Sequence, residues 1–273
     1  MNKKIMETLN QIVLQYPPEL IVSQQKDIPR VAFNISLSLR RSSGPLSQDH
    51  YESFEVCDIG GGVGLFSVGC AALGVKRSVL IDDFNDPINH QVGPKILDIH
   101  RSYGVEVALD DVIATGILDI DASFDAITSF DSMEHWHNSP KALFTEVVAK
   151  LKPGGLFVLG VPNCVNLRKR LTVPFGSGKW SSMADWYEDP VFRGHVREPD
   201  VDDLLYIARD MGLGDVCIKG RNWLGTLSPR LPVKVATRLI DYPLRLKPTF
   251  CSDLYLTGRK PQQNAPPMKE NPQ

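Results

Sequence analysis

Short apolar runs alternate with stretches of helical periodicity through the middle of the chain, from residue 54 to residue 162. The runs FEVCDI, RSVLID, VEVAL, FDAITSF and GLFVLGVP have the length and composition of buried strands. Helical spacing of apolar residues is found between them, in 64–74, 93–103 and 139–151. This alternation of strand and helix predicts the α/β class, with a doubly wound, mainly parallel sheet.

The second half of the chain adds further elements to this sheet. A polar and aromatic insertion at 163–200 precedes a predicted helix at 200–214. The runs DVCIKG and SDLYLTG then bring the predicted strands to seven. In parallel sheets of this kind, ligands bind at the carboxyl ends of the strands, so we expect functional residues to follow the strands directly.

Residues 1–50 are expected to form a helical cap. Apolar residues recur with helical spacing over 9–16, and the two prolines that start at Pro17 end this first helix. A second helix is expected over 29–41, before the polar loop SSGPLSQDH. The main domain is then expected over 51–260, followed by a disordered tail rich in Pro, Gln and Asn at 261–273.

Composition restricts the classes of partner and location. The 273 residues carry 30 Lys and Arg against 32 Asp and Glu, so no global field attracts nucleic acid, and none is expected as a partner. The five cysteines are scattered without the spacing of metal ligands, which is typical of reduced thiols. No stretch has the pattern of a signal peptide or a membrane span, so a cytoplasmic location is expected.

The segment EVCDIGGGVGLFS joins the first strand of the main domain to the next helix. Gly60, Gly62 and Gly64 permit a tight turn in which a ligand contacts the backbone. A dinucleotide fingerprint would need glycine or alanine where the chain has Ser67, and Asp58 would repel a pyrophosphate. The same carboxylate suits a cation, and S-adenosylmethionine (SAM) carries an ammonium and a sulfonium without any phosphate.

These features resemble the class I SAM-dependent methyltransferases, which have a Rossmann-like seven-stranded sheet. The Asp-x-Gly-x-Gly-x-Gly spacing, SVLIDDF, FDAITSFDSMEHW and LKPGGLFVLGVPN stand in the order of that family's motifs. The resemblance implies that Asp82, or its neighbour Asp83, accepts the ribose hydroxyls of SAM. It also implies that Asp110 or Asp111 lies near the adenine and that the stretch from Asp131 to Glu134, with Asp131 as the candidate contact, faces the cofactor cleft. Helix capping by Asp82 and a solvated loop at 110–111 are the alternatives.

Methyl transfer to a hydroxyl needs a positioned acceptor and a base, which is commonly histidine. His135 follows the fourth strand, and His195 lies in the insertion that is expected to cover the acceptor. Each is a candidate catalytic base, and each could instead be a structural histidine. His135 and His137 could hold a divalent metal, but no carboxylate of matching spacing follows them, so no metal site is expected.

The segments VPNCVNLRKRL and FRGHVREPD resemble methyltransferases of bacterial cell-surface glycan and lipid-linked sugar pathways. The pattern departs from the usual form at Pro199 and Asp200. The resemblance implies a small-molecule or glycan-linked acceptor that binds at 163–200, with a hydroxyl oxygen as the methylated atom. Four aromatic residues there could stack on a sugar ring or pack within a lid: Trp180, Trp186, Tyr187 and Phe192.

Residues 219–247 combine seven basic residues with an amphipathic pattern, which indicates a solvated cationic face or a weak contact with a membrane surface. Two other functions remain open from the sequence. One is an oxidoreductase that uses NAD(P), and the other is a non-catalytic subunit that binds SAM. The oligomeric state cannot be read from one chain.

Overall fold

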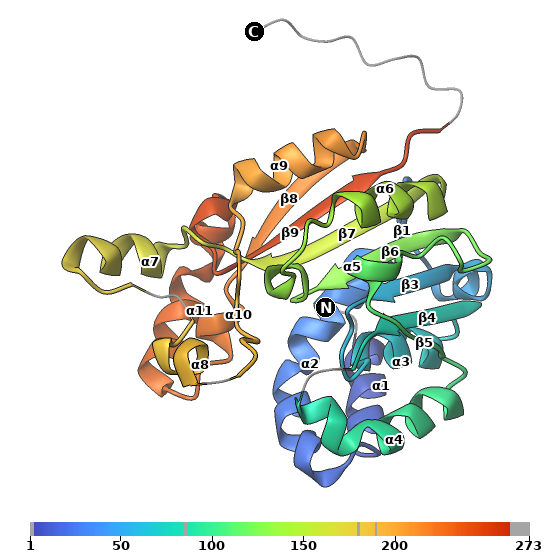
Figure 1. The fold of residues 1–273 in the computed structure, drawn as a ribbon, viewed down its shortest axis with the longest axis horizontal. Coiled ribbons are helices and arrows are strands. Elements are labelled where there is room, and N and C mark those ends of the chain that lie inside the picture. The colour runs from blue at the N-terminus through green and yellow to red at the C-terminus, as the bar shows by residue number, and fades with distance from the viewer. Residues whose placement is uncertain (1–2, 85–86, 179–180, 189, 263–273) are drawn as a thin grey trace, which may run out of the picture.

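The computed structural model describes residues 3–84, 87–178, 181–188 and 190–262. At its centre lies a seven-stranded sheet in the order β5-β4-β3-β6-β7-β9-β8 (Figure 1). Strand β9 is antiparallel to both of its neighbours, and the strands from β3 to β7 pair in parallel. The predicted fold class is therefore confirmed, and all seven predicted runs form strands: β3 (Glu55–Ile59), β4 (Arg77–Asp82), β5 (Glu106–Leu109), β6 (Phe124–Phe130), β7 (Leu151–Pro162), β8 (Gly214–Arg221) and β9 (Asp253–Arg259).

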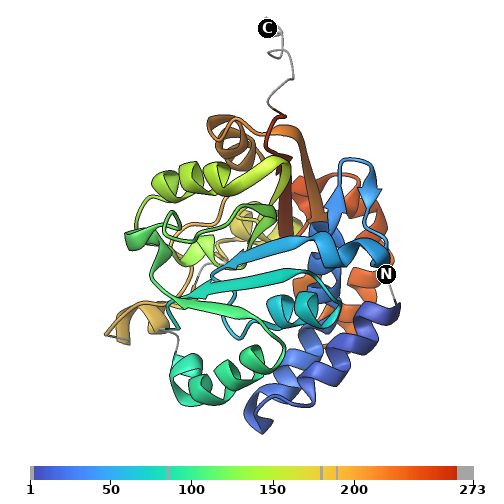
Figure 2. The same ribbon diagram turned by 90° about the vertical axis from the view of Figure 1, so that its right-hand side faces the viewer.

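Helices cover both faces of the sheet (Figures 1 and 2). The buried side chains form two clusters, one on each face, and this explains why the central strands are apolar almost throughout. One face carries α1 (Lys3–Val13), α2 (Pro18–Ser38), α3 (Leu65–Ala72) and α4 (Pro87–Ser102). The other carries α5 (Val112–Thr115), α6 (Lys141–Lys150) and α9 (Val201–Asp210).

A third group of helices lies beyond the carboxyl ends of the parallel strands (Figure 1). The predicted insertion after β7 supplies three of them, and the segment between β8 and β9 supplies the other three. This group therefore lies at the end of the sheet where ligands bind in such folds. Its members are α7 (Leu167–Thr172), η3 (Val173–Phe175), α8 (Met183–Glu188), α10 (Trp223–Thr226), α11 (Leu231–Arg245) and η4 (Pro248–Phe250).

The N-terminal prediction needs correction in two places. The second helix begins at Pro18 instead of Pro29, because proline is well suited to the first turn, where no N–H bond is required. The predicted loop after it contains a hairpin of β1 (Arg40–Arg41) and β2 (Gly44–Pro45), followed by η1 (Gln48–Ser53). Helix α4 also begins earlier than expected, and residues 263–273 of the expected tail lie outside the described part of the chain.

Helices α1 and α2 belong to the same core as the sheet. Leu9 and Ile35 are both fully buried and meet over Gly69 of α3. A Cβ atom at Gly69 would lie 2.8 Å from Leu9 Cδ2 and 2.9 Å from Ile35 Cδ1, so the three helices approach one another closely. This packing fixes α2 beside the carboxyl ends of β3 and β6, where Arg30 of α2 reaches the site described below.

We expect Leu9→Ala to lower the free energy of unfolding by about 2–5 kcal/mol, because it leaves a cavity between α1, α2 and α3. Leu14 lies just beyond α1 with 64% of its surface exposed, and Leu14→Ala should change stability by less than ~0.5 kcal/mol. Urea unfolding followed by circular dichroism measures both. Equal losses in the two variants would show that the helical cap does not share the core of the sheet.

Candidate functional site

The turn between β3 and α3 has a backbone that favours glycine. Gly60, Gly62 and Gly64 have φ values of +68°, +54° and +69°. The turn is tied down from both sides, because the Tyr16 hydroxyl donates to the Val63 carbonyl at 3.0 Å and Gly60 N donates to a β4 carbonyl at 2.7 Å. The predicted glycine turn therefore lies at the carboxyl end of β3, as a rigid floor.

Asp58 lies beneath this turn and does not line a cavity at the site. Its side chain is buried and accepts a hydrogen bond from Thr128 Oγ1 at 2.7 Å. A Cβ atom at Gly61 would lie 2.4 Å from Asp58 Oδ2, so the turn rests directly on the carboxylate. Burial raises the pKa of Asp58 to about 7, and the nearby charge of Asp82 adds to this effect.

Asp82 ends β4 and reaches across to the glycine turn. Its Oδ2 accepts from Gly62 N at 2.7 Å, and its Oδ1 accepts from Phe84 N at 2.7 Å. A carboxylate accepts hydrogen bonds at both of its oxygens, so a side chain in this place suits hydroxyl donors. Asp83 lies beside it on the same cavities.

Two adjoining cavities form one cleft above the glycine turn, with volumes of about 260 and 440 Å³. The smaller extends toward α5 and includes Gly60, Asp110 and Asp111, and the larger extends toward α2 and includes Gly62 and Asp131. The two share six lining residues: Asp82, Asp83, Ser132, His135, His137 and Arg193. Most of the predicted site residues thus meet at the carboxyl ends of β3, β4 and β6, whereas Asp58, Gly64 and His195 lie outside the lining.

Asp111 has a capping role at the edge of this cleft. Its Oδ1 accepts from Ile113 N at 3.1 Å, as the N-cap of the short helix α5. Asp110 and Asp111 are both exposed, and both line the smaller cavity.

Asp131 lies at the opposite edge, where the chain leaves β6. Its φ of +50° is unusual for a residue other than glycine, and its Oδ2 is 2.7 Å from Arg30 Nη1 of α2. Burial raises the pKa of the Asp131 carboxyl, although Arg30 acts against this effect. A strained backbone that holds a half-buried acid at a cavity is typical of a functional position.

His135 and His195 meet at the edge of the cleft, with their ring centroids 4.9 Å apart. His135 Nδ1 donates to the Arg193 carbonyl at 2.8 Å, which leaves the Nε2 lone pair of the neutral ring free to accept a proton. Burial lowers the pKa of His135. His195 Nδ1 contacts Glu198 Oε1 at 2.8 Å, and the other oxygen of Glu198 pairs with Lys169. Burial raises the pKa of the Glu198 carboxyl. The hydrogen bonds from His195 and Lys169 outweigh this effect, so the pKa lies below its usual value.

Glu134 is buried behind the two histidines. Its backbone carbonyl accepts from Val196 N at 2.7 Å, which fastens the segment of His195 to the segment of His135. Burial, and then the charge of Asp131, raises the pKa of the Glu134 carboxyl to about 8.

Three further residues contribute to the cleft: Ser132, which lies in the stretch expected to face it but was given no role, and Arg193 and Arg30, which the sequence reasoning missed. Ser132 lies under Gly60, where a Cβ atom would come within 2.0 Å of Ser132 Oγ. Arg193 lines both cavities and orients His135 through its carbonyl, and Arg30 neutralises Asp131 from 101 residues away in the chain. The position of Ser132, a polar residue directly after β6, could have predicted its place in the cleft. The positions of Arg193 and Arg30 depend on tertiary contacts and could not be predicted in this way.

Comparison with known families gives one match that covers most of the chain. Residues 25–218 match a family described as "Methyltransferase domain". No curated protein matches the sequence at a significant level.

Several solved structures share the fold at low sequence identity. A cyclopropane-fatty-acyl-phospholipid synthase-like protein from Lactobacillus casei is 13% identical, with a TM-score of 0.57 over 94% of this chain and 99% of its own. A SAM-dependent methyltransferase from Mesorhizobium loti is 16% identical, with a TM-score of 0.53 over 86% of this chain and 97% of its own. The magnesium protoporphyrin IX methyltransferase from Synechocystis, solved with S-adenosylhomocysteine (SAH), is 13% identical, with a TM-score of 0.53 over 95% of both chains.

The strand order with its antiparallel β9, the glycine turn after β3 and the acid at the end of β4 agree with the family match. The chain belongs to the methyltransferase-domain family and is a class I methyltransferase that uses S-adenosylmethionine.

Proposed function

We propose that the enzyme transfers the methyl group of SAM to a hydroxyl oxygen of a small-molecule or glycan-linked acceptor. The observation that carries this proposal is the shared lining of the two cavities. Asp82, Asp83 and His135 all line the region that the two cavities share. A cofactor held by the acids would therefore present its methyl group toward a ring that can accept a proton.

In this proposal the smaller cavity takes the adenosine of SAM, with the ribose hydroxyls on Asp82 and Asp83 and the adenine toward Asp111. The positive φ values of Gly60, Gly62 and Gly64 support a backbone floor for the methionine portion. A Cβ atom at Gly62 would have no neighbour within 4 Å, so space for a ligand lies above that residue. The buried carboxylate of Asp58 attracts the positive charge of SAM from beneath the turn. Asp131 is the acid closest to the ammonium group in this proposal.

The reaction is an in-line displacement at the sulfonium. The acceptor oxygen forms a bond to the methyl carbon, and the carbon–sulfur bond breaks with its electron pair left on sulfur. The products are a methyl ether and neutral SAH. The acceptor proton passes to Nε2 of His135, which the Arg193 carbonyl orients through Nδ1. In this scheme His195 is the second candidate base, beside His135 and outside the cavity lining.

The acceptor is proposed to bind under the segment that precedes α9. Phe192 and Arg193 of this segment line the larger cavity, and Trp186 and Tyr187 of α8 are 59% and 78% exposed. An aromatic ring in the cleft lining, such as Phe192, suits a sugar ring, which stacks through its apolar face. These features support a glycan-linked acceptor.

We expect Asp82→Asn to weaken SAH binding by about 1.5–3 kcal/mol, because the ribose hydroxyls lose a charged acceptor. Asp98→Asn is the matched control, since it removes the same charge at an exposed position of α4 outside both cavities and should leave the affinity unchanged. Calorimetric titration with SAH gives both affinities, and NAD(P) should produce no heat with the native enzyme. Unchanged affinity in Asp82→Asn would remove this residue from the cofactor site.

We expect His135→Ala to slow methyl transfer by roughly 10²-fold or more with little change in SAH affinity. His50→Ala, in η1 and outside both cavities, should keep the native rate. The assay follows SAH formation from SAM with a panel of hydroxylated small molecules and glycosides. Tight SAH binding without turnover on any acceptor would favour a non-catalytic subunit instead.

The exposed face of helix α11 supports a proposed contact with a further partner, an anionic membrane surface. Five apolar side chains form one exposed stripe along it: Leu231 (70%), Val235 (47%), Leu239 (77%), Tyr242 (75%) and Leu246 (72%). By helical spacing, Lys234, Arg238 and Arg245 lie along one edge of this stripe. In the described ranges no helix is long and apolar enough to cross a membrane. We infer that α11 binds weakly to the surface of the membrane without entering its core. This contact would bring the enzyme near lipid-linked acceptors.

We expect the native protein to sediment with vesicles that contain phosphatidylglycerol, and to be released by salt. Leu239→Glu should reduce the bound fraction at least fivefold, because it places a charge in the middle of the apolar stripe. Tyr206→Glu on α9, where the side chain is 66% exposed, is the matched control and should bind normally. Equal binding of Leu239→Glu, or equal binding to phosphatidylcholine alone, would contradict the contact.

A further inference from the structure

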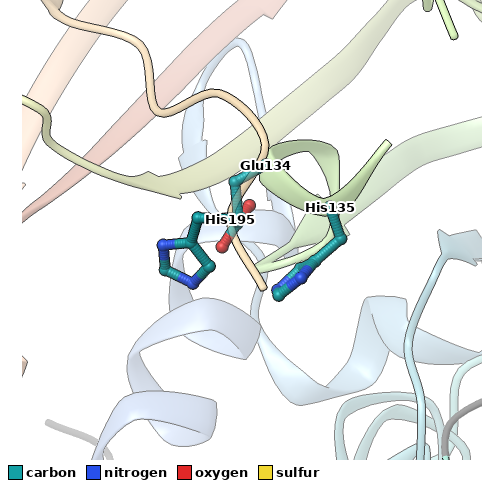
Figure 3. A group of neighbouring side chains, drawn as sticks. All are labelled: Glu134, His135 and His195. Atoms are coloured by element: carbon teal, nitrogen blue, oxygen red, sulfur yellow. The ribbon is translucent and has the colours of Figure 1, made fainter. Parts of the chain in front are cut away.

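Three side chains with metal-binding atoms converge at the edge of the cleft. Glu134 and His135 lie in η2 (Met133–His135), directly after β6, and His195 lies in the segment before α9. One ligand atom from each lies within 4.8 Å of the other two. Figure 3 shows the Glu134 carboxylate between the two imidazole rings. The two segments are 60 residues apart in sequence, and the backbone bond from Val196 N to the Glu134 carbonyl holds them together.

Both imidazole rings are oriented through the same nitrogen. His135 Nδ1 donates to the Arg193 carbonyl, and His195 Nδ1 donates to the Glu198 carboxylate, each at 2.8 Å. Histidines that bind metals are commonly held in this way, by a carbonyl or a carboxylate on the other ring nitrogen. Each ring therefore keeps its Nε2 lone pair for a ligand bond.

Glu134 supplies an independent indication. Its side chain is only 1% exposed, and its Oε2 has no hydrogen-bond partner among the described residues. A buried carboxylate oxygen without a partner is costly, and a bound cation would compensate this cost. Two histidines and one carboxylate with open positions are a known ligand set for divalent transition metals.

The neighbouring charges also suit a cation. Asp131 and Glu198 add two carboxylates beside the cluster, and Arg30 and Lys169 pair with them. The expectation of no metal site rested on His135 and His137 with no carboxylate of matching spacing. His137 is outside the cluster, and the structure supplies Glu134 and His195 in its place.

We propose that Glu134, His135 and His195 bind one divalent transition-metal ion at the acceptor end of the cleft. This proposal deepens the proposed function and rests on it, since the ion would coordinate the acceptor hydroxyl and lower its pKa. The methyl–oxygen bond then forms as the carbon–sulfur bond breaks, the electron pair stays on the sulfur of SAH, and the hydroxyl proton leaves to solvent. With the ion bound, His135 and His195 would serve as its ligands. His135 would then not act as the base, because the metal-bound hydroxyl loses its proton to solvent.

The direct test is binding of Co²⁺, because its visible absorption reports coordination without any need for turnover. The native enzyme, first treated with a chelator, should bind one equivalent. Glu134→Gln, His135→Ala and His195→Ala should each weaken binding at least tenfold. His137→Ala, which removes a histidine from the cleft lining but not from the cluster, should bind as the native enzyme does. SAH binding by each variant shows that the fold is intact.

Absence of a saturable Co²⁺ site in the native enzyme would overturn the proposal, even if the variants failed to fold. Equal Co²⁺ affinity in His195→Ala and the native enzyme would also overturn it, because binding would then be adventitious. The readout is independent of methyl transfer. Methylation of a hydroxyl that persists in chelator, without Co²⁺ binding, would remove the metal and leave the proposed function standing. One equivalent of Co²⁺, lost in the three ligand variants, supports the metal site whether or not an acceptor is methylated.

Discussion

The contact between the glycine turn and the buried Asp58 carboxylate determines where the cleft lies. A Cβ atom at Gly61 would come within 2.4 Å of Asp58 Oδ2, and one at Gly60 within 2.0 Å of Ser132 Oγ. Any larger side chain at either position would lift the turn from its support. The same turn places Gly62 N against Asp82, so one packing constraint sets both the floor of the cleft and the acid at its side.

The parallel sheet brings together residues that are distant in sequence. The carboxyl ends of β3, β4 and β6 supply the glycine turn, Asp82 and Asp131, and the packed helix α2 adds Arg30. The segment before α9 closes the other side through the bond between Val196 N and the Glu134 carbonyl. The cofactor acids and His135 therefore line one cleft without belonging to one contiguous motif.

The sequence was informative where local rules decide the structure. Short apolar runs predicted all seven strands, and positive φ at Gly60 and Gly62 agrees with the glycine pattern. The start of α2 was missed because Pro29 reads as a helix boundary, although this helix tolerates it. The burial of Asp58 and the meeting of Glu134 with His195 were not predictable, because both depend on how the chain packs over the sheet. The roles of the site residues remain predictions.

A crystal structure of the enzyme with SAH would test the central claim most directly, which is that the cleft above the glycine turn holds the cofactor with its sulfur toward the histidine pair. We predict the ribose hydroxyls on Asp82, the homocysteine portion over Gly60 and Gly62, and the sulfur facing His135 across the region that the two cavities share. SAH bound elsewhere, or with its sulfur directed away from His135 and His195, would contradict the account.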